Sequence, residues 1–109
     1  DVPHDARVCS EEIFGPVAPI FKFEDEAEAI ILANAGEEGL AGYFFTKDNA
    51  RVWRVAEAID CGLIGVNTGL MTTAETPFGG MKSSGLGREG GQEGLDAFLE
   101  TKCVCVSGL

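Results

Sequence analysis

Residues 40–67 read "LAGYFFTKDNARVWRVAEAIDCGLIGVN". The stretch begins with LAGYFFT (40–46) and ends with LIGVN (63–67), two nearly continuous apolar runs. Runs of this length are typical of strands that are buried on both faces of a sheet. The polar, periodic segment between them predicts a helix. The order strand, helix, strand therefore indicates an α/β fold with parallel pairing and a crossover connection.

The helix between these strands is predicted over roughly 49–60. Asp48 stands immediately before it, where a short acceptor side chain caps the first free N–H groups. Gly62 suits the turn after the helix, since glycine is the preferred residue there. Apolar residues recur at helical spacing and predict the inner face: Val52, Val55, Ala56 and Ile59.

The segments that flank this unit continue the alternation. APIFKF (18–23) is predicted as a strand and EDEAEAIILANA (24–35) as a helix with acidic residues in its first turn. A short helix is predicted near 91–99, and TKCVCV (101–106) is predicted as a strand. We therefore expect a mainly parallel sheet with flanking helices. The buried stripe of the helix at 24–35 is predicted to consist of Ala27, Ile30, Ile31 and Asn34.

The chain is strongly acidic. Its 109 residues include 18 acidic and 8 basic side chains, a formal net charge of −10. Nucleic acids and anionic membranes attract a basic surface, so this charge argues against both as partners. No apolar run approaches the ~20 residues of a membrane-spanning helix. The sequence opens on Asp1 without an initiating Met or a signal-peptide core, so we expect a piece of a longer protein.

The cysteines predict neither a metal site nor a disulfide framework. Cys9, Cys61, Cys103 and Cys105 include no C-x-x-C pair, and His4 is the only histidine. Cys103 and Cys105 would lie on one face of a strand, where they are poorly placed to bridge each other. Reduced cysteines of this kind are typical of cytoplasmic proteins, and we expect that location.

One glycine pattern suggests a dinucleotide-binding turn. GLGREG (85–90) matches the spacing G-x-G-x-x-G, which has mechanical meaning only between a strand and a helix. Here it follows MKSS within a loop that is already rich in glycine. We interpret these glycines as residues of tight turns.

Two longer motifs carry a resemblance to a known family. EEIFGPV (11–17) and PFGGMKSSGLGRE (77–89) resemble two motifs in the C-terminal part of the catalytic domain of aldehyde dehydrogenases. GVNTGL (65–70) followed by a threonine pair, with GLGREG (85–90) and the ending CVSGL (105–109), is most similar to the succinate-semialdehyde dehydrogenases. Glutarate-semialdehyde dehydrogenases share much of this pattern, so a glutarate-type or general aldehyde substrate stays an alternative.

The resemblance implies four binding residues. Glu12 matches the family glutamate that binds the nicotinamide ribose hydroxyls of NAD or NADP, and Phe14 matches an aromatic residue beside the nicotinamide ring. Phe78 matches a phenylalanine that lines the aldehyde tunnel. Thr72 stands where the succinate-semialdehyde type has a serine that binds the distal carboxylate of the substrate. Without the family, these would be a solvated acid, two core phenylalanines and a loop threonine.

The resemblance also implies what the chain lacks. The cysteine nucleophile, the general base and the dinucleotide-binding domain of the family match none of these residues, so we expect no catalytic residue and no activity of the chain alone. Residues 1–100 would form a partial catalytic domain, and residues 101–109 a strand that joins a neighbouring subunit of a homo-oligomer. The small-molecule partner implied is a semialdehyde.

Two further interpretations concern roles outside catalysis. Three charged residues of the second motif are read as structural, holding their loop by charge-assisted hydrogen bonds: Lys82, Arg88 and Glu89. An alternative from a different class treats the whole chain as an acidic α/β interaction module without an active site.

Overall fold

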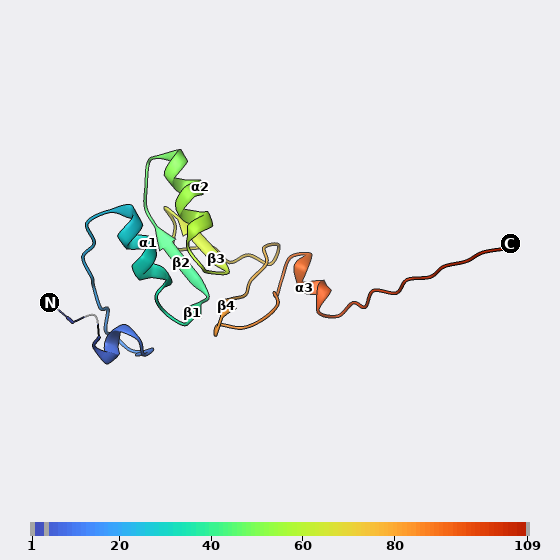
Figure 1. Ribbon diagram of the computed structural model, residues 1–109, viewed down its shortest axis with the longest axis horizontal. Helices are drawn as coiled ribbons and strands as arrows, with labels where there is room; N and C mark the ends of the chain where they lie inside the picture. Colours follow the sequence, from blue (N-terminus) through green and yellow to red (C-terminus); the bar gives the residue numbers. More distant parts are fainter. Residues whose placement is uncertain (1, 4, 109) are drawn as a thin grey trace.

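The computed structural model describes residues 2–3 and 5–108 and has a β-α-β unit at its centre (Figure 1). His4, Asp1 and Leu109 lie outside the described residues. In chain order the elements are the 3-10 helix η1 (Arg7–Cys9), α1 (Glu26–Asn34), β1 (Glu38–Gly39), β2 (Ala41–Phe44), α2 (Asn49–Ala58), β3 (Leu63–Val66), β4 (Met81–Lys82) and α3 (Glu93–Asp96).

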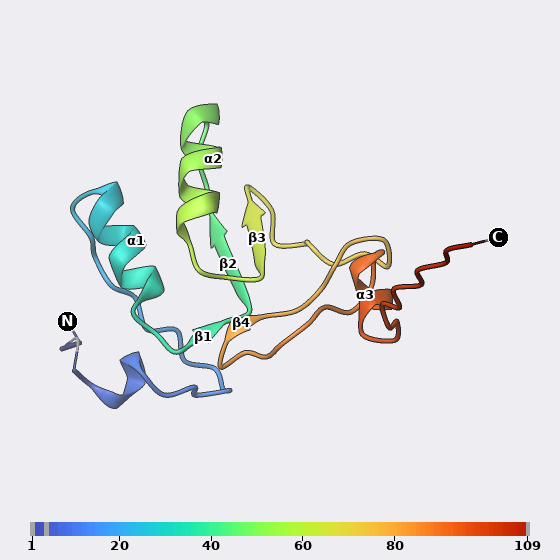
Figure 2. The ribbon, with the colours of Figure 1, turned by 45° about the vertical axis from the view of Figure 1, so that its right-hand side comes forward.

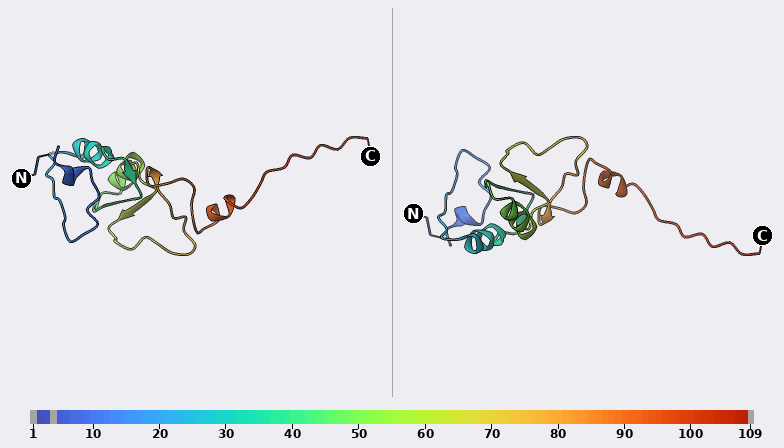
Figure 3. Two further views of the ribbon diagram at one scale, coloured as in Figure 1. Left: turned by 90° about the horizontal axis from the view of Figure 1, so that it is seen from below. Right: turned by 90° about the horizontal axis from the view of Figure 1, so that it is seen from above.

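Strands β2 and β3 pair in parallel, with Ala41 opposite Leu63 and Phe44 opposite Val66. Helix α2 connects them, so the strand–helix–strand prediction is confirmed. The short strands β1 and β4 form a separate antiparallel pair. Figures 2 and 3 show α1 and α2 on one side of the β2–β3 pair.

The predicted cap and inner face of α2 are confirmed. The carboxylate of Asp48 accepts a hydrogen bond from the N–H of Ala50 at 2.9 Å, which satisfies one of the free donors of the first turn. Val55 is buried, and three further residues of the predicted stripe are half-buried: Val52, Ala56 and Ile59. The spacing of the apolar residues predicted the buried face correctly because the charged residues of α2 lie on the other face.

The predicted stripe of α1 is only partly right. Ile30 and Asn34 face inward, whereas Ala27 is exposed and Ile31 is 69% exposed. Apolar residues surround this helix on several sides, so their spacing does not single out one face. The acidic first turn is confirmed, and Asp25 caps it by accepting from the N–H of Glu28 at 2.9 Å.

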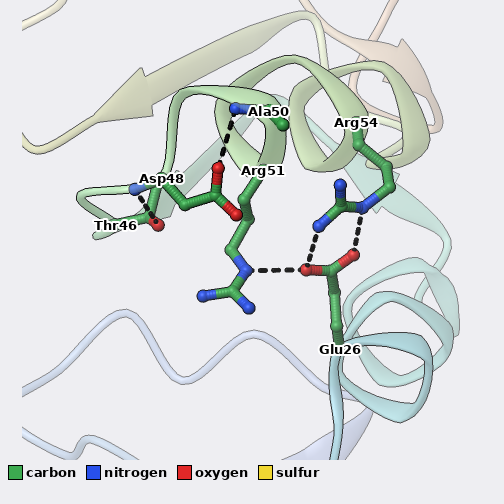
Figure 4. A network of polar contacts seen from close by, with 6 residues as sticks. All are labelled: Glu26, Thr46, Asp48, Ala50, Arg51 and Arg54. Atoms are coloured by element: carbon green, nitrogen blue, oxygen red, sulfur yellow. Dashed lines mark hydrogen bonds and ion pairs between the residues drawn. The ribbon is translucent and has the colours of Figure 1, made fainter.

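A charge cluster joins the first turn of α1 to α2 (Figure 4). One Glu26 carboxylate oxygen accepts from Arg51 Nε at 2.7 Å and from Arg54 Nη2 at 2.9 Å, and the other accepts from Arg54 Nε. These hydrogen bonds, first from Arg54 and then from Arg51, lower the pKa of Glu26 to about 2. The carboxylate therefore stays ionised well into the acid range.

Replacing Glu26 should change the acid stability of the chain. Because its pKa is lower in the folded than in the unfolded state, Glu26 contributes stability that is complete above its unfolded value of about 4.3 and disappears as the pH falls towards 2. Glu26→Gln should therefore be less stable than the wild type at pH 6 and equal to it near pH 2, measured by urea unfolding at low salt. Glu57→Gln, an exposed change on α2, is the control. Equal pH profiles for Glu26→Gln and the wild type would contradict the prediction.

Two strand predictions are wrong for the described chain. Residues 18–23 form no strand, because apolar alternation predicts an extended backbone but not the partner that makes a strand. The segment 40–46 is not buried on both faces, since Tyr43 is 52% and Phe45 76% exposed. No other segment among the described residues covers the side of the strand on which Tyr43 and Phe45 lie.

Residues 101–108 extend away from the body of the molecule and form no strand within the chain (Figure 1). Val104 and Val106 are exposed, as are Cys103 and Cys105, whose sulfur atoms are 3.9 Å apart and unbridged. The segment does not fold back onto β2 and β3, and its pairing with another subunit stays a prediction.

The described chain buries little of its apolar surface. Val55 and Leu63, which are 7% and 8% exposed, are the only buried apolar residues of the core among the described residues. The accessible surface is 9057 Å², whereas a compact monomer of this mass exposes roughly 5,800 Å². The radius of gyration is 18.8 Å, against about 13 Å for a compact domain of this length. The chain therefore has the surface of a protein part that lacks its neighbours.

Candidate functional site

The loop that carries Phe78 is closed by a backbone bridge. The N–H of Phe78 donates to the carbonyl of Glu89 at 2.7 Å, and the N–H of Glu89 donates back at 2.6 Å. Phe78 is 37% exposed and lines a hollow of about 230 Å³ together with Leu40 and Ala97. Phe78 thus borders an open hollow with a mixed polar and apolar lining.

Two of the charged residues read as structural do hold this loop. Arg88 Nη1 donates to the carbonyls of Gly80 at 2.9 Å and Gly87 at 2.7 Å. Lys82 Nζ donates to carbonyls at the end of α1. For Glu89 the prediction of a charge-assisted hydrogen bond is wrong, because Glu89 holds the loop through its backbone bridge to Phe78 and its carboxylate makes no hydrogen bond within the described residues.

Close backbone packing explains glycines of the loop. A Cβ atom on Gly62 would collide with the carbonyl group of Gly79, and one on Gly80 would collide with Ser84. Gly85 and Gly87 have positive φ values of 121° and 77°, which favour glycine. GLGREG follows β4 without opening a helix, so the interpretation as turn glycines is confirmed.

Thr72 lies in the exposed loop that follows β3. A local network shapes this loop: Thr76 Oγ1 donates to the carbonyl of Thr73 at 3.2 Å and accepts from its N–H at 3.3 Å. A hydrogen bond from Thr73 lowers the pKa of Glu75. Thr72 is exposed and makes no hydrogen bond within the described residues.

Glu12 and Phe14 lie in the exposed segment after η1. Arg7 and Glu11 form a bidentate ion pair at 2.7 Å that braces η1, while Glu12 is left outside this pair. Phe14 is 94% exposed and has a φ of 48°, which is uncommon for a residue with a large side chain. A hydrogen bond from the N–H of Val17 to the carbonyl of Gly15 tightens the turn behind it.

The two predicted pairs lie in different segments, since Glu12 and Phe14 follow η1 whereas Thr72 and Phe78 follow β3. Figure 3 shows the segment between η1 and α1 and the loop after β3 both projecting from the side opposite α1 and α2. Within the described residues, no hydrogen bond joins Glu12 or Phe14 to Thr72 or Phe78. The structure therefore does not link the two pairs directly.

The sequence analysis did not predict two asparagine side chains that each bind a carbonyl and an N–H of another segment. Asn34 Nδ2 donates to the carbonyl of Ala58 at 2.7 Å, and its Oδ1 accepts from the N–H of Asp60 at 2.9 Å. Asn67 pairs in the same way with both backbone groups of Thr46, each at 2.8 Å. A polar amide within an apolar helical stripe was the signal for Asn34. For Asn67, the signal was an asparagine at the end of a strand, a residue type that tolerates its φ of 58°.

Comparison with known proteins decides the family. A model of the aldehyde dehydrogenase family matches residues 1–104. The chain belongs to the aldehyde dehydrogenase family. It is 54% identical over 109 residues to the mitochondrial succinate-semialdehyde dehydrogenase of Rattus norvegicus, covering 100% of this chain and 21% of that enzyme. It is also 54% identical over 107 residues to the glutarate-semialdehyde dehydrogenase of Pseudomonas putida, covering 98% of this chain and 22% of that enzyme.

The solved structures agree with an α/β fold of this family. The betaine aldehyde dehydrogenase of Staphylococcus aureus, in complex with NAD+, superposes with a TM-score of 0.88 at 43% identity. The match covers 94% of this chain and 20% of that one. The chain spans about a fifth of the length of the relatives that it matches. Family membership favours the enzyme interpretation over the acidic interaction module.

The described residues contain no cluster of three or more metal-ligating side chains, and no helix among them is long and apolar enough to cross a membrane. All four cysteines are free. Burial raises the pKa of Cys61, which makes it a weaker nucleophile at neutral pH.

Proposed function

We propose that this chain forms one wall of the active site of an NAD(P)-dependent semialdehyde dehydrogenase. The whole enzyme would oxidise a semialdehyde of the succinate or glutarate type to the dicarboxylic acid through a cysteine thioester. The observation that carries the proposal is the exposed ring of Phe14 on a left-handed backbone beside Glu12, whose carboxylate makes no ion pair within the described residues. An exposed aromatic face can pack against a planar ring.

The residues present fit the nicotinamide end of a dinucleotide. Glu12 offers two carboxylate oxygens, which suit the two hydroxyls of a ribose. Phe14 offers an aromatic face that limits where a ring can settle. When bound, the dinucleotide accepts the hydride removed from the substrate. The chain's own part is to hold the ribose and orient the ring.

The residues for the aldehyde lie after β3. We assign the wall of the aldehyde tunnel to Phe78, where an apolar ring excludes water from the reacting carbon. Thr72 would donate its hydroxyl to the distal carboxylate of the substrate. Its extra methyl group, compared with serine, would narrow the site slightly. Relatives named for succinate and for glutarate semialdehyde support this substrate class equally.

The exposed edges support a larger assembly. β2 and β3 would belong to a mainly parallel sheet that other segments of the enzyme complete. Residues 101–108 would add a strand to a neighbouring subunit of a homo-oligomer, since an extended apolar segment readily pairs with a free sheet edge. The free cysteines favour a reducing compartment such as the cytoplasm, whereas the rat relative is named as mitochondrial.

Glu12→Gln in the whole enzyme should weaken the binding and positioning of the dinucleotide. Losing a charge-assisted hydrogen bond costs about 1.5–3 kcal/mol, or about 10- to 150-fold in kcat/KM for the dinucleotide. Steady-state kinetics and the quenching of protein fluorescence by the dinucleotide measure the loss. Glu11→Gln is the matched control, since Glu11 pairs with Arg7 instead. Unchanged kinetics and binding in Glu12→Gln would remove Glu12 from the cofactor site.

A further inference from the structure

Helix α1 ends without a positive charge of its own, and Lys82 supplies one from far along the sequence. The last turn of α1 contains no basic residue. Lys82 Nζ donates to the carbonyl of Asn34 at 3.0 Å and to that of Gly36 at 3.2 Å. A helix C-terminus has free carbonyls and a partial negative charge, so an ammonium group there satisfies both.

The same lysine also reaches the end of α2. Its Nζ lies 3.8 Å from Oδ2 of Asp60, a residue whose N–H donates to the side chain of Asn34. Lys82, Asn34 and Asp60 thus form a polar cluster, which we call the helix-end cluster. It joins the ends of α1 and α2 to β4.

Lys82 has an unusual backbone conformation. Its φ is 53°, in the left-handed region that favours glycine. The strand pairing of Lys82 with Glu38 and the hydrogen bond from the N–H of Ser83 to Glu37 hold the main chain there. A lysine is therefore held in a glycine-like conformation while its side chain reaches the helix end.

We propose that Lys82 is a positioning residue for the aldehyde wall and acts through Phe78. Residues 79–81 alone separate the two, and Phe78 is tied on its other side to Glu89. The loop is thus fixed at both ends, at Glu89 by the backbone and at Lys82 by the helix-end cluster. This inference rests on the proposed function of Phe78.

The test uses the whole enzyme with four variants: Lys82→Met, Lys82→Arg, Phe78→Leu and the double variant Lys82→Met/Phe78→Leu. Lys82→Met should raise KM for the semialdehyde about 10-fold with a smaller change in kcat, because a displaced Phe78 ring would lose packing against the bound substrate, and about 1.4 kcal/mol of lost binding is tenfold. Lys82→Arg should recover part of this loss. In the Phe78→Leu background, Lys82→Met should change KM by less than about twofold, because coupled residues are not additive. Lys47→Met is the control, since Lys47 is exposed and makes no ion pair within the described chain.

Several results would overturn the inference. They are a wild-type KM in Lys82→Met, a lower melting temperature as its only change, or a full effect of Lys82→Met in the Phe78→Leu background. If Lys82→Met does not fold, Lys82→Gln is measured in its place: a wild-type KM in that variant contradicts the inference, and a KM raised severalfold supports it. A wild-type KM in Phe78→Leu alone instead contradicts the proposed role of Phe78, and with it the route through that residue.

Discussion

The purified 109-residue chain should produce no NADH or NADPH from succinate semialdehyde above the rate measured without protein. In the proposed function it would supply a ribose ligand, a ring contact and a tunnel wall, but none of its cysteines matches the family nucleophile. Covalent catalysis needs an activated thiolate, and the pKa of Cys61 is shifted upward, away from such activation. One ribose contact also cannot replace a whole dinucleotide site, so binding of NAD or NADP should be weak or absent.

This result is measured by absorbance at 340 nm with protein prepared from a host that lacks its own enzyme of this type. The whole enzyme, assayed under the same conditions, is the positive control. Steady production of reduced dinucleotide by the chain alone would contradict both the inactivity and the assignment of the nucleophile to other sequence.

Gly62→Ala should unfold the chain or severely destabilise it, because the substitution disrupts the packing of the loop that contains Gly79 against β3. The added Cβ would collide with the backbone of Gly79 and Gly80, and no side-chain rotation can relieve a collision with backbone. We expect a loss of about 3 kcal/mol, at the upper end of the range for overpacking. Urea unfolding of the chain, followed by circular dichroism, measures it.

Gly69→Ala is the matched control for this substitution. Gly69 is also a loop glycine beside β3, but a Cβ atom there would have no neighbour within 4 Å. The change should alter the unfolding free energy by less than about 0.5 kcal/mol, as is usual for exposed positions. Equal stability of the two variants would mean that Gly62 and Gly79 are not in close contact in solution.

Local signals in the sequence predicted local structure well. Asp48 and the spacing of Val52, Val55 and Ile59 defined α2, because a cap and an amphipathic face depend only on neighbouring residues. Ile31 was placed on the wrong face of α1 because apolar residues nearly surround that helix. The strand at 18–23 was wrong because pairing depends on a partner that no local pattern specifies.

The candidate site was likewise predictable from the sequence only in part. Family motifs singled out Glu12, Phe14, Thr72 and Phe78 in the sequence, but the direction in which their two segments project became visible only in three dimensions. The contact of Lys82 with the end of α1 spans 48 positions and has no sequence signal besides a lysine in a long motif. Hydrogen bonds between distant backbone carbonyls and a side chain follow from the assembled fold alone.

Because its accessible surface is large, the chain is suited to be one piece of a split protein, that is, a protein assembled from two separate chains. Its excess over a compact monomer is roughly 3,200 Å², several times the ~800 Å² that each partner contributes to a standard protein–protein interface. Much of this excess is carried by apolar side chains such as Phe14, Trp53 and Phe98. Two separately synthesised pieces of the enzyme would therefore meet over an area large enough for stable reassociation, without a covalent link between them.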